Sequence, residues 1–164
     1  MEMIFLLLVD SWQVYRKYYF IKPICTYGIY MKKGVITKQI GASPNDNENQ
    51  VADYFANLGY NVLFLAISKT KHDNSPDVKI CYKEWEIKTP KESGKYTIEH
   101  AIQRASKQSG HIIIDLRQCK MLETKALAKI QKESNLRKVI KTMLVITKSK
   151  ELLILKGEFG SIKV

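Results

Sequence analysis

Helix-like and strand-like patterns alternate along the chain from residue 46 onward. The first is an amphipathic stripe ending near Leu58, where Asp46 or Asn47 can cap a helix and Gly59 can end it. After it, short apolar runs between turn-rich segments predict strands, and two further amphipathic stretches predict helices. The elements predicted after the first helix are a strand at 60–67, two strands within 76–90 joined by a turn near Tyr82–Lys83, a helix at 97–109, a strand at 111–116, a helix at 122–135, and a hairpin of strands at 139–147 and 151–155.

This order predicts an α/β domain over residues 46–164. Its core is αβββαβ with a mixed central sheet, extended by a C-terminal helix and hairpin. Residues 1–45 form a separate segment in which aromatic residues are interleaved with lysine and arginine. We interpret this segment as strands, because aromatic residues favour strands. A surface that stacks nucleic-acid bases is the alternative.

The charge of the chain narrows the choice of partner. A formal charge of +11 at pH 7 predicts a polyanion, with nucleic acid the first candidate and an anionic membrane surface the second. Three widely spaced cysteines without a C-x-x-C pair argue against a disulfide framework or a zinc site. The apolar run 4–9 is too short to span a bilayer and has no basic flank, so we expect no membrane span and no signal peptide.

The predicted hairpin at 76–90 carries the candidate chemistry. Side chains alternate across a strand, so Glu86 and Lys88 share the face opposite Trp85. Asp77 comes to the same end of the hairpin. Carboxylate oxygens are ligands that Mg²⁺ prefers, and a nearby lysine can orient the water that the ion holds. This combination predicts a phosphodiesterase site.

Each of these residues also has a structural interpretation. Asp77 can cap a turn, and Glu86 with Lys88 can form an exposed, screened ion pair. Burial of Trp85 on the opposite face favours an enclosed polar face instead. Glu48, one turn into the first helix, either points into the site or completes a capping arrangement.

The spacing of the charged residues resembles that of the PD-(D/E)xK nucleases. Asp77 follows a proline, and eight residues separate it from Glu86-x-Lys88. The αβββαβ order is the restriction-endonuclease-like core that these nucleases share. The resemblance implies that Asp77 and Glu86 bind Mg²⁺, with Mn²⁺ as a substitute, that Lys88 positions the attacking water, and that Glu48 assists.

The amino-acid sequence of the hairpin and its flanks resembles that of the C-terminal toxin domains of contact-dependent growth-inhibition (CdiA-type) proteins. The stretches that carry this likeness are Ser75–Val78, Trp85–Pro90, Thr97–Glu99, Ala105–Ser109, Ile112–Arg117 and Leu144–Lys148. It implies a tRNA nuclease that acts in the cytoplasm of a target cell and is blocked by a cognate immunity protein. Residues 1–45 are outside the likeness.

A second mechanism stays open at this stage. Some toxin domains of this broad group are metal-independent ribonucleases, in which the 2′-hydroxyl is the nucleophile. Lys88 would then be central, together with residues that we otherwise predict to bind substrate. The predicted substrate-binding residues are Thr89, Thr97, His100, Lys107 and Gln108.

Other classes of function are also compatible with the sequence. DNA is the alternative substrate, and a non-catalytic nucleic-acid-binding or partner-binding module of a mobile element is the alternative to an enzyme. We expect the lysines of residues 122–141 to form an electrostatic track for a nucleic-acid backbone.

Overall fold

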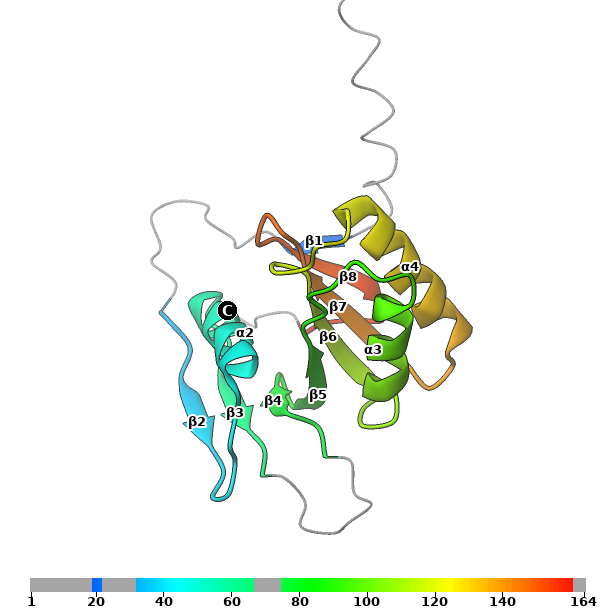
Figure 1. Cartoon of the computed structure of the whole chain (residues 1–164). Helices are drawn as coiled ribbons and strands as arrows, with labels where there is room; N and C mark the ends of the chain where they lie inside the picture. The colour runs from blue at the N-terminus through cyan, green and yellow to red at the C-terminus, as the bar shows by residue number, and fades with distance from the viewer. Residues whose placement is uncertain (1–18, 22–31, 67–74, 161–164) are drawn as a thin grey trace, which may run out of the picture.

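The computed structural model describes residues 19–21, 32–66 and 75–160 (Figure 1). Within these ranges the helices and strands form one mixed sheet and three covering helices. In chain order they are β1 (Tyr19–Ile21), β2 (Ile36–Lys38), α2 (Asp46–Asn57), β3 (Val62–Phe64), β4 (Val78–Ile80), β5 (Lys83–Lys88), α3 (Thr97–Ala105), β6 (His111–Asp115), α4 (Glu123–Leu136), β7 (Thr142–Ile146) and β8 (Leu152–Lys156).

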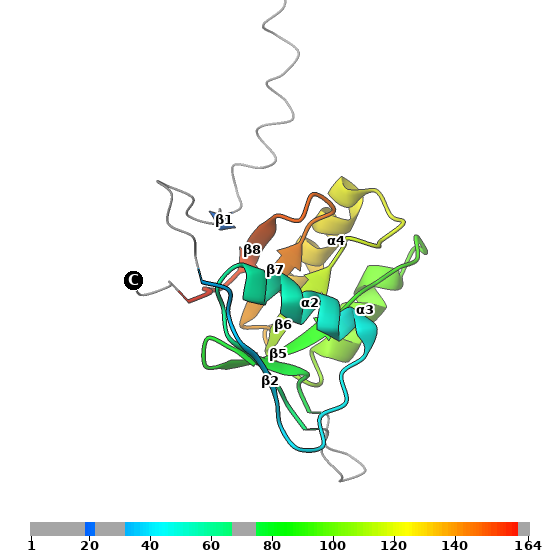
Figure 2. The same ribbon diagram turned by 90° about the vertical axis from the view of Figure 1, so that its left-hand side faces the viewer.

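The sheet order is β1-β8-β7-β6-β5-β4-β3-β2. Strands β5, β6 and β7 are parallel, whereas β3–β4, β4–β5 and β7–β8 are antiparallel. The predicted αβββαβ order, the mixed sheet and the C-terminal helix and hairpin are therefore confirmed. Figures 1 and 2 show α2 on one face of the sheet and α3 with α4 on the other.

Two apolar clusters hold these layers together. Ile112 and Ile114 of β6 pack with α3 and α4, whereas Ile113, between them, packs on the α2 side with Phe55 and Trp85. Because side chains alternate across a strand, a strand covered on both faces must be apolar at every position. This is why residues 112–114 are all apolar. Such a continuous apolar run indicates a strand in the centre of the sheet.

The turn between β4 and β5 sets the register of the candidate hairpin. Cys81 and Tyr82 adopt left-handed backbone conformations, with φ of 50° and 62°. This makes the connection a two-residue turn of the kind that matches strand twist. The predicted turn at Tyr82–Lys83 was wrong by one position, because Lys83 already pairs with Ile80.

Two helix boundaries also differ from the predicted ones. Asn45, not Asp46 or Asn47, is the N-cap of α2, since its side chain accepts the Glu48 N–H at 3.1 Å. Helix α3 ends at Ala105 rather than at residue 109, and turns cover the following residues.

The described part of residues 1–45 lies at the two edges of the sheet. Strand β1 pairs with β8 and β2 pairs in parallel with β3. Gly34 N–H donates to Ala56 O at 2.8 Å, and an added Cβ there would lie 2.0 Å from Tyr60 O. The apolar run 4–9 and most of the aromatic and basic residues lie outside the described residues, and the division of the chain at residue 45 stays a prediction. Across the described ranges, no helix has the length and apolar character needed to cross a membrane.

Phe159 closes the cluster under α2 from the C-terminal side. Its ring lies 5.8 Å from Phe55, 4.9 Å from Tyr60 and 5.6 Å from Trp85, measured between centroids. Only 8% of the residue is exposed. The segment after β8, which the sequence patterns left unassigned, is therefore part of the core.

We expect Phe159→Ala to lower the free energy of unfolding by about 3 kcal/mol, because it leaves a cavity among three aromatic rings. Urea denaturation would measure this loss. Ile40→Ala is the matched control, since Ile40 is fully exposed and its truncation should change stability by less than about 0.5 kcal/mol. Equal effects of the two substitutions would contradict the packing of the C-terminal segment.

Candidate active site

The hairpin brings the predicted acidic pair together. Since Val78 pairs with Trp85, Asp77 lies opposite Glu86 on the face that Lys88 also occupies. Asp77 N–H donates to Trp85 O at 3.0 Å, and Asp77 Oδ2 accepts the Ile87 N–H at 2.7 Å. The Asp77 carboxylate is thus fixed by backbone at the point where the two strands separate.

Glu86 is the most constrained member of the site. Its side chain is 0% exposed, and its Oε1 accepts a hydrogen bond from Lys88 Nζ, whose side chain is 28% exposed. Its other oxygen, Oε2, is buried and has no hydrogen-bond partner among the described residues. The interpretation of Glu86 and Lys88 as an exposed, screened ion pair is therefore wrong.

Three carboxyl groups of this region have raised pKa values. Burial, and then the charge of the neighbouring Asp77, raise the pKa of Glu86 to about 8. Burial also raises the pKa of Asp77. The pKa of Glu48 is raised by burial and then by Asp77. Because each group resists ionisation beside the others, a cation placed among them would be favoured.

Glu48 has both of the roles that the sequence left open. It forms a capping box with Asn45, whose backbone N–H donates to Glu48 Oε2 at 3.1 Å. It also lines a cavity of about 220 Å³ together with Asp77 and Pro76. The capping contact holds the Glu48 carboxyl where it interacts electrostatically with Asp77 and Lys88.

The donor set suits a hard divalent cation. Asp77 and Glu86 supply carboxylate oxygens from one face, and the buried Glu86 Oε2 is left to be satisfied. Magnesium is commonly held by one or two carboxylates, with water and substrate phosphate completing its shell. No cluster of three or more His, Cys, Asp or Glu residues suited to a metal occurs in the described ranges. Asp77 and Glu86 could therefore hold Mg²⁺ only together with water or substrate phosphate.

The predicted substrate-binding residues are distributed over both ends of α3. Thr89 follows Lys88 directly, and its buried Oγ1 has no partner among the described residues. Thr97 begins α3, where it is partly buried, and His100 is exposed and stacks on Tyr96 with centroids 6.0 Å apart.

Lys107 and Gln108 lie past the other end of α3. The neighbouring Ser109 hydroxyl donates to Glu84 O at 2.7 Å, which places this segment beside the start of β5 rather than its end. The structure therefore separates Lys107 and Gln108 from Lys88 along β5. The roles of all five residues in substrate binding stay predictions.

Sequence reasoning missed a second charged pair near the site. Asp115 ends β6, next to the end of β5, and is 1% exposed. Arg117 binds it through two hydrogen bonds, Nε to Oδ1 at 2.9 Å and Nη2 to Oδ2 at 2.7 Å. Gln118 Nε2 donates to Gln50 Oε1 of α2 at 3.1 Å. The signal available in the sequence was the position of Asp115 at the carboxyl end of a parallel strand, where ligand-binding groups gather.

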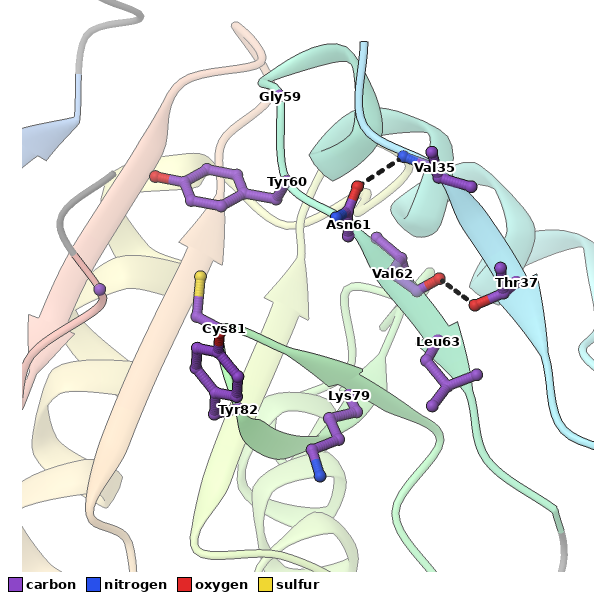
Figure 3. Close-up of a pocket in the computed structure, with 11 residues that line it drawn as sticks. Val35, Thr37, Gly59, Tyr60, Asn61, Val62, Leu63, Lys79, Cys81 and Tyr82 are labelled. Atoms are coloured by element: carbon purple, nitrogen blue, oxygen red, sulfur yellow. Dashed lines mark hydrogen bonds between the residues drawn. The ribbon is translucent and has the colours of Figure 1, made fainter. Parts of the chain in front are cut away.

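A larger hollow, of about 900 Å³, lies away from the acidic residues (Figure 3). It is bordered by β2, β3 and the hairpin turn, with Lys79, Cys81 and Tyr82 among its lining residues. Figure 3 shows Asn61 on its rim, where its Oδ1 accepts the Val35 N–H at 2.8 Å. None of its lining residues is acidic, so we place the chemistry at the smaller cavity.

The central part of the chain is similar to a known protein family. Residues 74–152 match the family model described as the contact-dependent growth inhibition CdiA C-terminal domain. The resemblance to CdiA C-terminal domains is confirmed. The matched region contains Asp77, Glu86 and Lys88, and it begins after α2, so that Glu48 lies outside it.

A solved structure shares the fold of this chain. It is described as the CdiA-CT/CdiI toxin and immunity complex from Burkholderia pseudomallei. The match has a TM-score of 0.53 and 19% identity, and covers 75% of this chain and 99% of that chain. At this identity the likeness establishes the fold alone. No curated protein sequence matches the chain.

The raised pKa of Glu86 leads to a pH-dependent stability. The ordinary pKa of a glutamate is 4.5, whereas that of folded Glu86 is about 8. Between these values the folded chain holds more protons than the unfolded chain, so the contribution of Glu86 to the free energy of unfolding falls as the pH rises. We expect Glu86→Gln to reduce the loss of stability between pH 5 and pH 8 by at least roughly 1 kcal/mol. Urea denaturation in EDTA at both pH values would measure it. Glu84→Gln, an exposed change on the same strand, should leave the pH dependence unaltered.

The two roles of Glu48 are separable by substitution. Glutamine keeps an oxygen for the capping box but removes the charge, so Glu48→Gln should change the free energy of unfolding by less than about 0.5 kcal/mol. It should also reduce the rise in melting temperature that Mg²⁺ produces. Glu48→Ala should in addition lose about 1 kcal/mol of stability through the lost cap. If Glu48→Gln shows the same response to Mg²⁺ as the unsubstituted chain, Glu48 is only a capping residue.

Proposed function

We propose that this CdiA-type domain is a toxin nuclease that hydrolyses phosphodiester bonds in RNA, with tRNA as the preferred substrate. The observation that carries the proposal is the cross-strand pair of Asp77 and Glu86 with Lys88 on the same face. Glu86 Oε2 is buried there and has no hydrogen-bond partner in the described part of the chain. The formal charge of +11 supports a polyanionic substrate. Since the structural neighbour is described as a toxin and immunity complex, we further propose a cognate immunity protein and action inside a target cell.

The residues of the site have distinct roles in this proposal. Asp77 and Glu86 would hold Mg²⁺, or Mn²⁺ in its place, which when bound polarises a phosphoryl oxygen and lowers the pKa of a bound water. Lys88, hydrogen-bonded to Glu86, orients the water for in-line attack and stabilises the negative charge that develops on the phosphoryl oxygens. Glu48 adds negative charge at the same cavity and is positioned by Asn45.

A cleavage assay tests the mechanism. Purified protein is incubated with total tRNA or with plasmid DNA, each in Mg²⁺ or EDTA. We expect tRNA cleavage that requires Mg²⁺ and a rate at least about 100-fold lower in Lys88→Ala, because the substitution removes a charge placed at the reacting groups. Lys79→Ala is the matched control, since Lys79 lies in the same hairpin and lines the other hollow.

Each outcome of this assay distinguishes one alternative. Cleavage that is undiminished in EDTA would overturn the metal-dependent mechanism in favour of a metal-independent ribonuclease. Cleavage of plasmid with intact tRNA would overturn the RNA substrate. Binding of tRNA without cleavage would indicate a non-catalytic module. As a second readout, induced expression without an inhibitor should stop growth, and Lys88→Ala should restore it.

A further inference from the structure

Three loops meet at the carboxyl edge of the parallel strands. Because β5, β6 and β7 run in the same direction, the segments that follow them, 89–96, 116–122 and 147–151, emerge at one edge of the sheet. Lys120 N–H donates to Lys91 O at 2.9 Å and joins the first two loops. We call these three segments the edge loops.

Hydrogen bonds to the helices hold the third edge loop in place. Lys148 N–H donates to Glu123 Oε2 at 2.6 Å, at the start of α4. Tyr54 of α2 donates its hydroxyl to Lys150 O at 2.9 Å. The backbone of this loop is thus tied to both layers of helices, and it presents the Lys148 and Lys150 side chains to solvent.

The edge loops carry cations that are available to a ligand. Five lysines of these loops are exposed. They are Lys91, Lys95, Lys120, Lys148 and Lys150. Of these, Lys120 is the one with an ion pair among the described residues, a wide contact of 3.3 Å with Glu92 in which both side chains are more than 60% exposed.

Arg117 gives this surface a fixed centre. Its two hydrogen bonds to the buried Asp115 hold the guanidinium plane, and the ring of Tyr54 lies 5.5 Å below it. Within the described residues, Nη1 makes no hydrogen bond. An arginine held in this way presents a donor to a phosphate at little cost in side-chain entropy.

The basic residues of α4 and its C-terminal flank are placed less well than the lysines of the edge loops to bind a substrate at the acidic pair. Lys129 and Arg137 are held in ion pairs with Glu99 and Glu133. Lys141 N–H donates to Gly110 O at 2.7 Å, immediately before β6 begins, so this lysine lies at the opposite edge of the sheet from Lys88. Helix α4 starts beside the third edge loop and leads toward Lys141, so the exposed Lys132, Lys138 and Lys141 lie progressively farther from the edge loops.

We infer that the RNA backbone binds across the edge loops, around Arg117, rather than along α4 as the charge pattern of the sequence predicts. The inference rests on the proposed function, because it names the surface that carries the substrate to that site. Phosphates on either side of the scissile bond contact Lys91 at one end and Lys148 and Lys150 at the other.

Binding of fluorescently labelled tRNA to the full chain tests this surface. The Glu86→Gln background prevents cleavage, and fluorescence anisotropy at several salt concentrations measures the dissociation constant. We expect the triple change Lys91→Gln, Lys148→Gln, Lys150→Gln to weaken binding by at least about tenfold and to reduce the salt slope by about 3, because it removes three phosphate contacts. The matched control, Lys132→Gln, Lys138→Gln, Lys141→Gln, has the same change of charge and should weaken binding less than about twofold.

Arg117→Lys tests the centre of the surface. The lysine keeps the charge but loses the planar fork that binds the buried Asp115, so we expect binding to weaken several-fold and the melting temperature to fall as well. Anisotropy is therefore measured well below the melting temperature of this variant. If the control triple weakens binding as much as the edge-loop triple, the inference is overturned while the nuclease proposal stands. If the background protein binds no tRNA and the unsubstituted chain cleaves none, the proposed function itself is overturned.

Discussion

The pairing of Asp77 with Glu86 is the constraint on which the rest of the structure depends. It follows from the two-residue turn at Cys81–Tyr82, whose left-handed backbone sets the register of β4 and β5. A shift of one residue would turn Glu86 toward the α2 face, into the cluster around Trp85, and would bring the indole to the polar face. The geometry of the turn therefore determines the geometry of the site.

The fold accepts an electrostatic cost at this point. Glu86 is buried with one oxygen unpartnered, while Lys88 and the Ile87 N–H satisfy only part of the acidic pair. Two apolar clusters, one on each face of the sheet, offset this cost and keep the carboxyl groups from moving apart. A buried carboxyl oxygen that has no partner among the described residues is typical of a site that is completed by a ligand.

Parallel strands explain why groups distant in the sequence share one edge. The ends of β5, β6 and β7 bring Lys88, Asp115 and Thr147 to the same edge of the sheet. Such an edge gathers loops whatever their separation along the chain. The groups that we propose to be catalytic are therefore held on strands, and the cations that we propose to contact the substrate lie on the loops around them.

The sequence alone determined the order of elements and the local half of the site. The alternation of side chains places Glu86 and Lys88 on one face whatever surrounds them, and the apolar runs identify the central strands. Tertiary structure decided the rest. The Asp115–Arg117 pair depends on where β6 ends against α2, the position of Lys107 depends on the direction of α3, and the availability of each lysine depends on which acidic side chain lies beside it. These properties are non-local, because they depend on the register and packing of strands and helices that no short pattern of residues encodes.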